Sequence, residues 1–174
     1  MEPATSRRLR IDPMTVDDWP EVRRIYAEGI ATLNASLERE APDWAHFDHS
    51  HRADCRLVAR SGDGGPVIGW TALGSYSARK VYRGVAWESV YVAAEARGTG
   101  VGRRLLEALI PESEAAGLWT LLAAVLSDNG ASLQLHESVG FRRVGFQRGL
   151  GQDAAGRWRD IVLLERRSGV VGVG

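Results

Sequence analysis

The spacing of hydrophobic residues switches repeatedly along the chain between a helical and a strand-like period. After Trp19, the residues Val22, Ile25 and Tyr26 recur with helical spacing, which predicts an amphipathic helix. Short runs that are rich in β-branched, aromatic and leucine residues predict strands. These strands are expected at residues 9–11, 55–61, 66–76, 85–92, 118–126, 141–150 and 157–167.

Two more helices are predicted in the second half of the chain. Residues 100–116 carry an apolar stripe, and Pro111 is expected to end or bend this helix because proline removes an amide donor. Residues 127–140 begin with cap-type residues and close at Gly140, as in a short helix. The polar residues 31–55 are expected to form a loop with one or two short helices. Alternating strands and helices, with antiparallel-looking strands at the end, predict a mixed α/β domain.

Composition and length limit the possible functions. The chain of 174 residues is 44% hydrophobic and shows no internal repeat or linker, so we expect a single domain over 1–174. Its core should span about residues 9–166, with flexible ends. The 22 basic and 22 acidic side chains balance, which argues against a nucleic-acid or acidic-membrane binder. No partner of either kind is therefore expected.

The cysteine and histidine content bears on metals and on location. Cys55 is the only cysteine, which rules out an intramolecular disulfide and a metal site built on several cysteines. His46, His49 and His51 lie among aspartates, and we interpret them as a solvated surface; no metal is predicted. The first eleven residues lack an apolar signal core, and no stretch reaches the roughly 18 apolar residues of a membrane span. A cytoplasmic protein is the default expectation.

A glycine-rich loop joins a predicted strand to a predicted helix at residues 97–102, with the sequence RGTGVG. A helix N-terminus offers unpaired amides and a positive dipole end, and glycines let the backbone approach a ligand closely. Phosphate or pyrophosphate is the natural ligand of such a loop. Arg103 stands where a dinucleotide fingerprint needs its third glycine, and the lysine of a nucleotide P-loop is missing. A simple tight turn remains an alternative.

Two motifs together resemble a known family. Arg97, Gly100 and Gly102 match the pattern Arg/Gln-x-x-Gly-x-Gly/Ala of the Gcn5-related N-acetyltransferases (GNAT), and SDNGASLQLHESVGF resembles a second motif of that family. The segments SARKVYRGVAWESVYV and GRWRDIVLLERR are similar to its phosphinothricin and methionine sulfoximine acetyltransferase branch. The similarity runs from about Leu9 to Arg166.

The resemblance implies the GNAT fold, a mixed central sheet of about seven strands with about four helices. It also implies direct transfer of an acetyl group, in a ternary complex, from acetyl-CoA to the α-amino group of a small amino acid or analogue, in a homodimer. The residues that it implies for acetyl-CoA binding are Val90, Tyr91, Val92, Arg97, Gly98, Thr99, Gly100, Val101, Gly102, Arg103, Asn129 and Ser132.

Acetyl transfer needs a base for the amine and an acid for the departing thiolate. Glu88 is the predicted base, although the branch carries its glutamate one residue earlier, where Trp87 stands here. A shift of one residue turns a strand side chain to the opposite face, and a β-bulge would be needed to restore its aim. If Glu88 points away, water held by backbone carbonyls is the alternative base. His136 is the predicted acid, unless it is only a capped helix histidine.

The acceptor site is expected at two segments. Thr32, Leu33 and Leu37 match the family's loop after the first helix, which covers the acceptor. Arg79 and Tyr82 match positions that face an acidic group of the acceptor, and ordinary surface is their alternative reading. Two other functions stay open at this point: acetylation of an antibiotic, polyamine or peptide N-terminus, and a non-catalytic acyl-CoA-binding module.

Overall fold

The structure, a computed structural model, describes residues 9–174, so the N-terminal end that we expect to be flexible lies outside the described part. The α-helices are α1 (Trp19–Ala31), α2 (Trp44–Ser50), α3 (Val101–Ala115) and α4 (Gly130–Ser138). The strands are β1 (Leu9–Pro13), β2 (Leu57–Ser61), β3 (Val67–Ser75), β4 (Val85–Val92), β5 (Thr120–Leu126), β6 (Arg142–Gln152) and β7 (Trp158–Arg167). Short 3-10 helices are η1 (Val16–Asp18), η2 (Lys80–Tyr82) and η3 (Ala94–Ala96).

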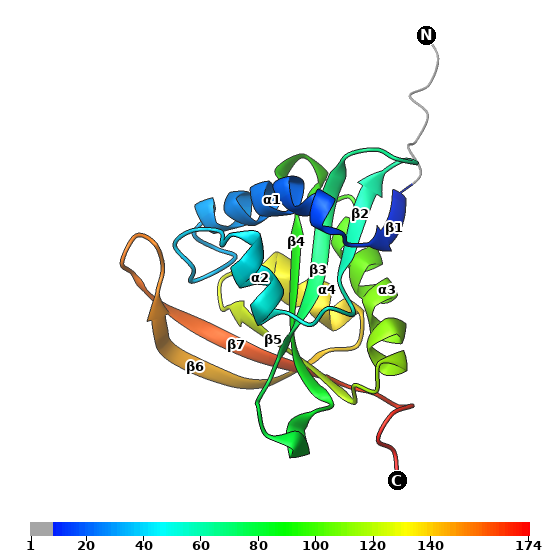
Figure 1. Cartoon of the computed structure of the whole chain (residues 1–174). Helices are drawn as coiled ribbons and strands as arrows, with labels where there is room; N and C mark the ends of the chain where they lie inside the picture. The colour runs from blue at the N-terminus through cyan, green and yellow to red at the C-terminus, as the bar shows by residue number, and fades with distance from the viewer. Residues whose placement is uncertain (1–8) are drawn as a thin grey trace.

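All seven strands belong to one sheet, in the order β1-β2-β3-β4-β5-β7-β6 (Figure 1). β4 and β5 are parallel, and the other neighbours are antiparallel. β6 and β7 form a long hairpin that extends to one side of the molecule (Figure 1). The expectation of a mixed sheet of about seven strands with four helices is confirmed.

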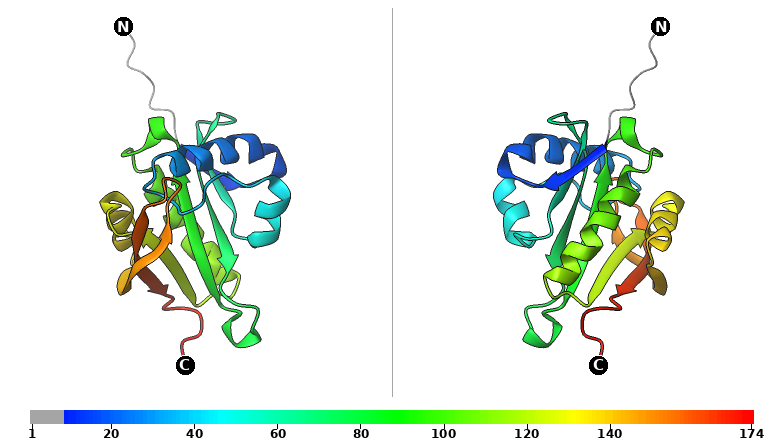
Figure 2. Two further views of the ribbon diagram at one scale, coloured as in Figure 1. Left: turned by 90° about the vertical axis from the view of Figure 1, so that its left-hand side faces the viewer. Right: turned by 90° about the vertical axis from the view of Figure 1, so that its right-hand side faces the viewer.

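Helices cover both faces of the sheet, with α1 and α2 on one and α3 and α4 on the other (Figure 2). Neighbouring residues of β3 show the division. Trp70 is fully buried towards α1 and α2, where it stacks on Tyr91 at 4.8 Å and meets the ring of Tyr26 at its edge. Gly69 faces α3, and a Cβ there would come within 3.0 Å of Val101 Cγ1. Glycine at this position therefore lets α3 lie close against the sheet.

The proline predicted to end or bend α3 does not end it. The helix continues through Pro111 to Ala115. Pro111 is on the exposed side, where water can satisfy the carbonyl that a helical amide would otherwise have bonded. The chain leaves the helix at Gly117, whose φ of 81° lies in the left-handed region that glycine adopts without strain.

Candidate active site

The central feature of the site is a gap between β4 and β5. The two strands pair only from Val85–Trp87 with Thr120–Leu122, although β4 continues to Val92 and β5 to Leu126. Beyond these pairs β4 keeps β3 as its neighbour on one side and has no strand on the other. A strand edge of this kind presents unpaired backbone groups. The gap can therefore accept a ligand that hydrogen-bonds as a strand does.

A groove of about 380 Å³ leads into this gap. It runs between the glycine loop at the start of α3 and the first turns of α4. Val90 and Val92 form its floor on β4, and Leu135 lines it from α4. The other lining residues are Ala35, Ala96, Arg97, Gly98, Gly100, Val101, Gly102, Arg103, Asn129, Ala131 and Ser132.

Two glycines of the loop are required by their backbone conformation. Gly98 and Gly100 have φ values of 75° and 88°, and a Cβ on either would meet no atom within 4 Å. Gly100 caps α3, and its carbonyl accepts the first helical hydrogen bond from the amide of Arg104 at 3.1 Å. The amides of residues 101–103 therefore have no partner within the helix. They and the helix dipole are suited to bind a pyrophosphate.

Gly102 serves a different purpose. A Cβ on this residue would lie 2.9 Å from Leu135 Cδ2, so its absence lets α3 and α4 approach each other. Thr99 supports the loop by donating its hydroxyl to the carbonyl of Ala96 at 2.6 Å. Arg103 pairs with Glu107 at 2.8 Å along the exposed surface of α3. Arg97 donates to the carbonyl of Val92 at 3.2 Å.

Asn129 connects the groove with the loop that follows α1. Its side-chain oxygen accepts the amide of Ser132 at 3.1 Å and so caps α4. Its side-chain nitrogen donates to the carbonyl of Asn34 at 2.7 Å. The start of α4 and the loop after α1 are thus joined by one amide side chain, placed at the edge of the groove.

Glu88 and His136 form a buried pair beside the gap. His136 Nε2 lies 2.8 Å from Glu88 Oε2, and the side chains are 3% and 1% exposed, respectively. The other ring nitrogen of His136 lies 2.7 Å from the carbonyl oxygen of Ser132. An imidazole that faces an acceptor with both nitrogens donates from both, and only the imidazolium has two N–H groups. The contacts therefore favour a charged histidine.

The pKa of His136 reflects these opposing influences. Burial lowers the pKa, but the charge of Glu88, the hydrogen bond to its carboxylate and the bond to Ser132 outweigh this effect and raise it above the ordinary value. Glu88 also receives a weaker hydrogen bond from the Thr71 hydroxyl at 3.4 Å. The pairing of β3 with β4 is in continuous register from Gly69–Ser75 to Ala86–Val92, so no bulge redirects Glu88. Its side chain points to the face that carries α4.

Tyr91 lies on the opposite face of β4 from Glu88. Its ring packs on Trp70, and its hydroxyl donates to the carbonyl of Ala35 at 3.4 Å. Burial raises the pKa of this phenol, so Tyr91 stays neutral. Only its backbone faces the gap, as expected for a residue of the ligand-binding strand edge. Its ring instead supports the loop after α1.

That loop contains the residues predicted to cover an acceptor. The Thr32 hydroxyl donates to the carbonyl of Gly29 at 2.6 Å and accepts the amide of Asn34 at 3.1 Å. Leu33 has a φ of 55°, a left-handed conformation that costs an L-residue about 1–2 kcal/mol. Leu37 reaches the β6–β7 hairpin, where a Cβ on Gly151 would lie 2.8 Å from Leu37 Cδ1.

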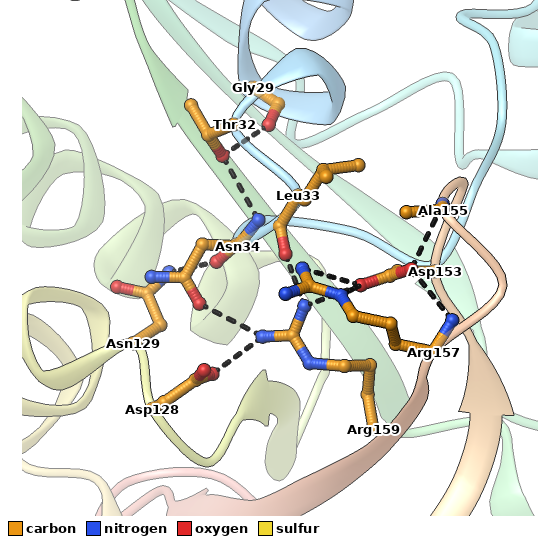
Figure 3. A network of polar contacts seen from close by, with 10 residues as sticks. All are labelled: Gly29, Thr32, Leu33, Asn34, Asp128, Asn129, Asp153, Ala155, Arg157 and Arg159. Carbon is orange, nitrogen blue, oxygen red and sulfur yellow. Dashed lines mark hydrogen bonds and ion pairs between the residues drawn. The ribbon is translucent and has the colours of Figure 1, made fainter.

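Sequence reasoning missed Arg159 in this region. Arg159 lies on β7 and is 9% exposed. Figure 3 shows its guanidinium directed at Asp128, Asp153 and the residues Leu33 and Asn34 of the loop after α1. The sequence holds no local signal for this role, because residues 157–160 (RWRD) read as the ordinary, largely polar start of a strand.

The comparisons with known proteins agree with this geometry. Residues 17–141 match the acetyltransferase (GNAT) family. The chain belongs to this family. It is therefore an acetyl-CoA-dependent N-acetyltransferase, which confirms the resemblance and the fold expected from it. The acetyl donor of this family, acetyl-CoA, carries a pyrophosphate, which is the kind of anion that the glycine loop is suited to bind.

Relatives cover most of the chain. The phosphinothricin N-acetyltransferase of Alcaligenes faecalis is 38% identical over 159 residues, which cover 86% of this chain and 78% of that protein. The L-methionine sulfoximine/L-methionine sulfone acetyltransferase of Pseudomonas paraeruginosa is 33% identical over 154 residues, which cover 86% and 89%. A crystal structure of a GNAT superfamily phosphinothricin acetyltransferase from Sinorhizobium meliloti in complex with AcCoA has a TM-score of 0.83 and 26% identity, covering 94% and 90%.

The residues predicted to contact an acidic group of the acceptor lie apart from the loop of residues 32–43 after α1. Arg79 and Tyr82 are in the β3–β4 connection, at the opposite end of β4 from the glycine loop (Figure 1). The guanidinium of Arg79 lies 5.4 Å from the ring centre of Tyr82. Among residues 9–174, no hydrogen bond joins either side chain to residues 32–43. Their role stays a prediction.

The part of the chain that the structure describes holds no group of three or more side chains suited to a metal ion. None of its helices is long and apolar enough to cross a membrane.

Substitution of Gly100 should separate donor binding from folding. In Gly100→Glu a carboxylate enters the pyrophosphate site, so we expect acetyl-CoA affinity to fall by at least about 100-fold, because like charges repel at close range. Gly117→Glu is the matched control, since Gly117 is also left-handed with no atom within 4 Å of a Cβ, at the other end of α3. Isothermal titration calorimetry should show near-normal affinity for the control. Equal affinities of the two variants would exclude the loop from the donor site.

Proposed function

We propose that this chain acetylates the α-amino group of a small amino acid or amino-acid analogue, of the phosphinothricin or methionine sulfoximine type. The observation that carries this proposal is the gap between β4 and β5, which joins the pyrophosphate groove on one face to the loop of residues 32–43 on the other. An acetyl group in the gap would be accessible from that second face. The substrates named for the two relatives described above support the acceptor class.

In this mechanism His136 holds the proton that the departing thiolate takes up. The amine nitrogen attacks the acetyl carbonyl carbon, a C–N bond forms, the C–S bond breaks, and the sulfur leaves with the bonding electrons. The raised pKa and the two acceptor contacts favour the charged form of His136, which has no lone pair with which to accept a proton from the amine. It therefore acts as an acid beside the gap, and its proton reaches the sulfur when one of its two hydrogen bonds, to Glu88 or to the Ser132 carbonyl, is exchanged for one to the thiolate.

Glu88 then acts mainly through His136. Its carboxylate is occupied by the imidazolium and lies on the α4 face of β4. We assign Glu88 the role of raising the pKa of His136 and orienting its ring. The ammonium proton of the acceptor passes to water held at the unpaired backbone carbonyls of β4, the alternative that the one-residue offset already left open.

The acceptor is placed against Thr32, Leu33 and Leu37. These residues belong to a loop that is fixed at both ends by hydrogen bonds, and Thr32 borders a small hollow above Tyr91. For the acidic group of the acceptor we propose the Arg79–Tyr82 segment, in which the guanidinium of Arg79 forms no ion pair with the residues that the structure describes. The cytoplasmic location stays a prediction.

We propose further that the enzyme is a homodimer whose interface includes exposed apolar side chains of the β6–β7 hairpin. Phe146 and Trp158 are 56% and 68% exposed, and strand alternation places both on the same face of the hairpin. β6 is an edge strand of the sheet. Exposed apolar side chains on an edge strand are typical of a surface that is covered by a partner.

The acceptor class is tested with a panel of amines. We expect phosphinothricin, L-methionine sulfoximine and L-methionine sulfone to have kcat/KM values at least about 100-fold above those of spermidine and an alanine-initiated peptide, a difference of about 2.7 kcal/mol. Thiol release from acetyl-CoA gives the rate, and mass spectrometry gives the acetylated nitrogen. A preference for the peptide or polyamine would overturn the acceptor assignment. Acetyl-CoA binding without turnover of any amine would indicate a binding module.

The pH dependence of kcat tests the Glu88–His136 pair. Since the pKa of His136 is raised, the acid should be available below that pKa and be lost as pH rises through it. The contribution of the Glu88–His136 pair to the free energy of unfolding should change in the same direction. It should be complete below the pKa of His136 in the unfolded chain, about 6.5, and be lost as pH rises through the higher pKa of the folded protein. In Glu88→Gln the carboxylate charge is gone, so the descending limb of kcat should move to lower pH.

The measurement is kcat with saturating acetyl-CoA and L-methionine sulfone from about pH 5.5 to about pH 10. Thr71→Val is the matched control, because it removes the weaker contact to Glu88 and keeps the charge. Its profile should follow the wild type. A descending limb that stays in place in Glu88→Gln would show that His136 is not the titrating acid.

Light scattering after gel filtration tests the dimer. The wild type should elute with twice the mass of one chain, and the double variant Phe146→Lys with Trp158→Lys should elute as a monomer, because two buried charges would oppose association. Val170→Lys is the control, since Val170 is 70% exposed in the C-terminal tail. A dimer that survives the double substitution would place the interface elsewhere.

A further inference from the structure

Arg159 holds three separate segments of the chain together. Its guanidinium donates to the carbonyl of Leu33 and, at 3.3 Å, to the side-chain oxygen of Asn34, both in the loop after α1 (Figure 3). It pairs with Asp128, in the β5–α4 connection, at 2.7 Å. It pairs with Asp153, in the β6–β7 turn, at 2.9 Å. Through Arg159, the loop of residues 32–43 is thus attached to the β5–α4 connection and the β6–β7 turn, which are both remote from it in sequence.

The charge of Asp153 is fixed by Arg159 together with neighbours in the β6–β7 turn. Burial alone would raise the pKa of Asp153, but the amides of Ala155 and Arg157 and the guanidinium groups of Arg157 and Arg159 hold it at about 2. Asp153 is therefore a permanent anion in the β6–β7 turn. It fixes one edge of the Arg159 guanidinium and leaves the other N–H groups for the loop and Asp128.

Arg159 hydrogen-bonds to two residues of the loop, Leu33 and Asn34, whose positions depend on contacts from outside the loop. Leu33 is in a left-handed conformation that is rare for a leucine, and its carbonyl is a direct acceptor of Arg159. Asn34 is held from both sides, because its carbonyl also accepts the side chain of Asn129 at the edge of the donor groove. The position of residues 33–34 relative to the donor site is therefore set jointly by Arg159 and Asn129.

Arg159 is poorly suited to bind the acceptor itself. Two carboxylates already neutralise its charge, and its terminal nitrogens are engaged with protein acceptors. A planar fork that donates in several directions at once is a property of arginine and not of lysine. The arrangement suits a residue that positions others.

We propose that Arg159 is a positioning residue for the acceptor: it locks Leu33 and Asn34 in the geometry in which the loop of residues 32–43 closes over the acetyl-group site. This inference rests on the proposed function of that loop. It assigns to a residue on β7 a larger part in acceptor affinity than in donor binding, because none of its contacts reaches the glycine loop.

Steady-state kinetics of the full chain test this role. Arg159→Met should raise KM for L-methionine sulfone at least tenfold and leave KM for acetyl-CoA within twofold. Arg159→Lys should recover part of the acceptor affinity, since it keeps one ion pair. Arg166→Met is the matched control, because Arg166 is also an ion-paired arginine of β7, bound to Glu114 at the other end of the strand. Unchanged KM values, or an equal rise in both, in Arg159→Met would overturn the proposal.

A second measurement does not require turnover. Arg39 lies in the exposed part of the loop, so trypsin cleavage after Arg39 reports loop opening. Cleavage should be at least tenfold faster in Arg159→Met than in Arg166→Met. Equal rates would contradict the proposed role of Arg159. If Arg159→Met does not fold, Asp128→Ala removes one partner of Arg159 from an exposed position and should shift both measurements in the same direction. A wild type that acetylates no amino acid would overturn the proposed function. The cleavage rates would still show whether Arg159 holds the loop of residues 32–43 in place.

Discussion

The separation of β4 from β5 after only three residue pairs is the constraint on which the rest of the site depends. A sheet interior normally satisfies the backbone groups of both strands, and here one edge of each is left open in the middle of the molecule. A ligand with strand-like hydrogen bonds, as proposed for the acetyl donor, would complete the edge. The elements around it each take a part that follows from the gap: α3 brings its N-terminal amides, α4 covers one side, and the loop after α1 covers the other.

Few charged side chains are buried near the gap, and each of them has a partner of opposite charge. Isolated ions are expensive to bury, so Glu88 with His136 and Arg159 with Asp153 occur as pairs with further hydrogen bonds. Such pairs add little net stability, but they demand defined geometry. One pair lies on the α4 face beside the gap, where we propose that it sets a protonation state. The other lies on the opposite face, where we propose that it sets the position of a loop. On these proposals the two faces of the sheet separate chemistry from recognition.

Much of this arrangement could be predicted from the sequence, because it depends on local patterns. The strands and helices follow from hydrophobic spacing, and Gly98 and Gly100 in left-handed conformations are what a glycine loop before a helix indicates. The direction of Glu88 could not be settled, because strand side chains alternate and only the observed register excludes a bulge. Arg159 could not be found, because its loop partners are 125 and 126 residues away in the chain. Contacts across such separations are created by the fold and leave little trace in local sequence.

The same contacts bear on how an acidic acceptor is recognised. An amino-acid acceptor carries a carboxylate. Arg159 is not available to neutralise this carboxylate, because Asp128 and Asp153 already neutralise the charge of Arg159. On the acceptor face of β4, Trp87 takes the place where the branch has a glutamate, so no carboxylate of this strand repels an anion there. The ring of Trp87 lies 6.0 Å from that of Tyr76, which in turn lies 5.4 Å from that of Tyr82. This aromatic series connects the acceptor face of β4 with Arg79, whose guanidinium has an aromatic neighbour and no ion pair among the described residues. These contacts support the proposal that the β3–β4 connection supplies the cation for the acceptor, while the loop after α1 supplies shape.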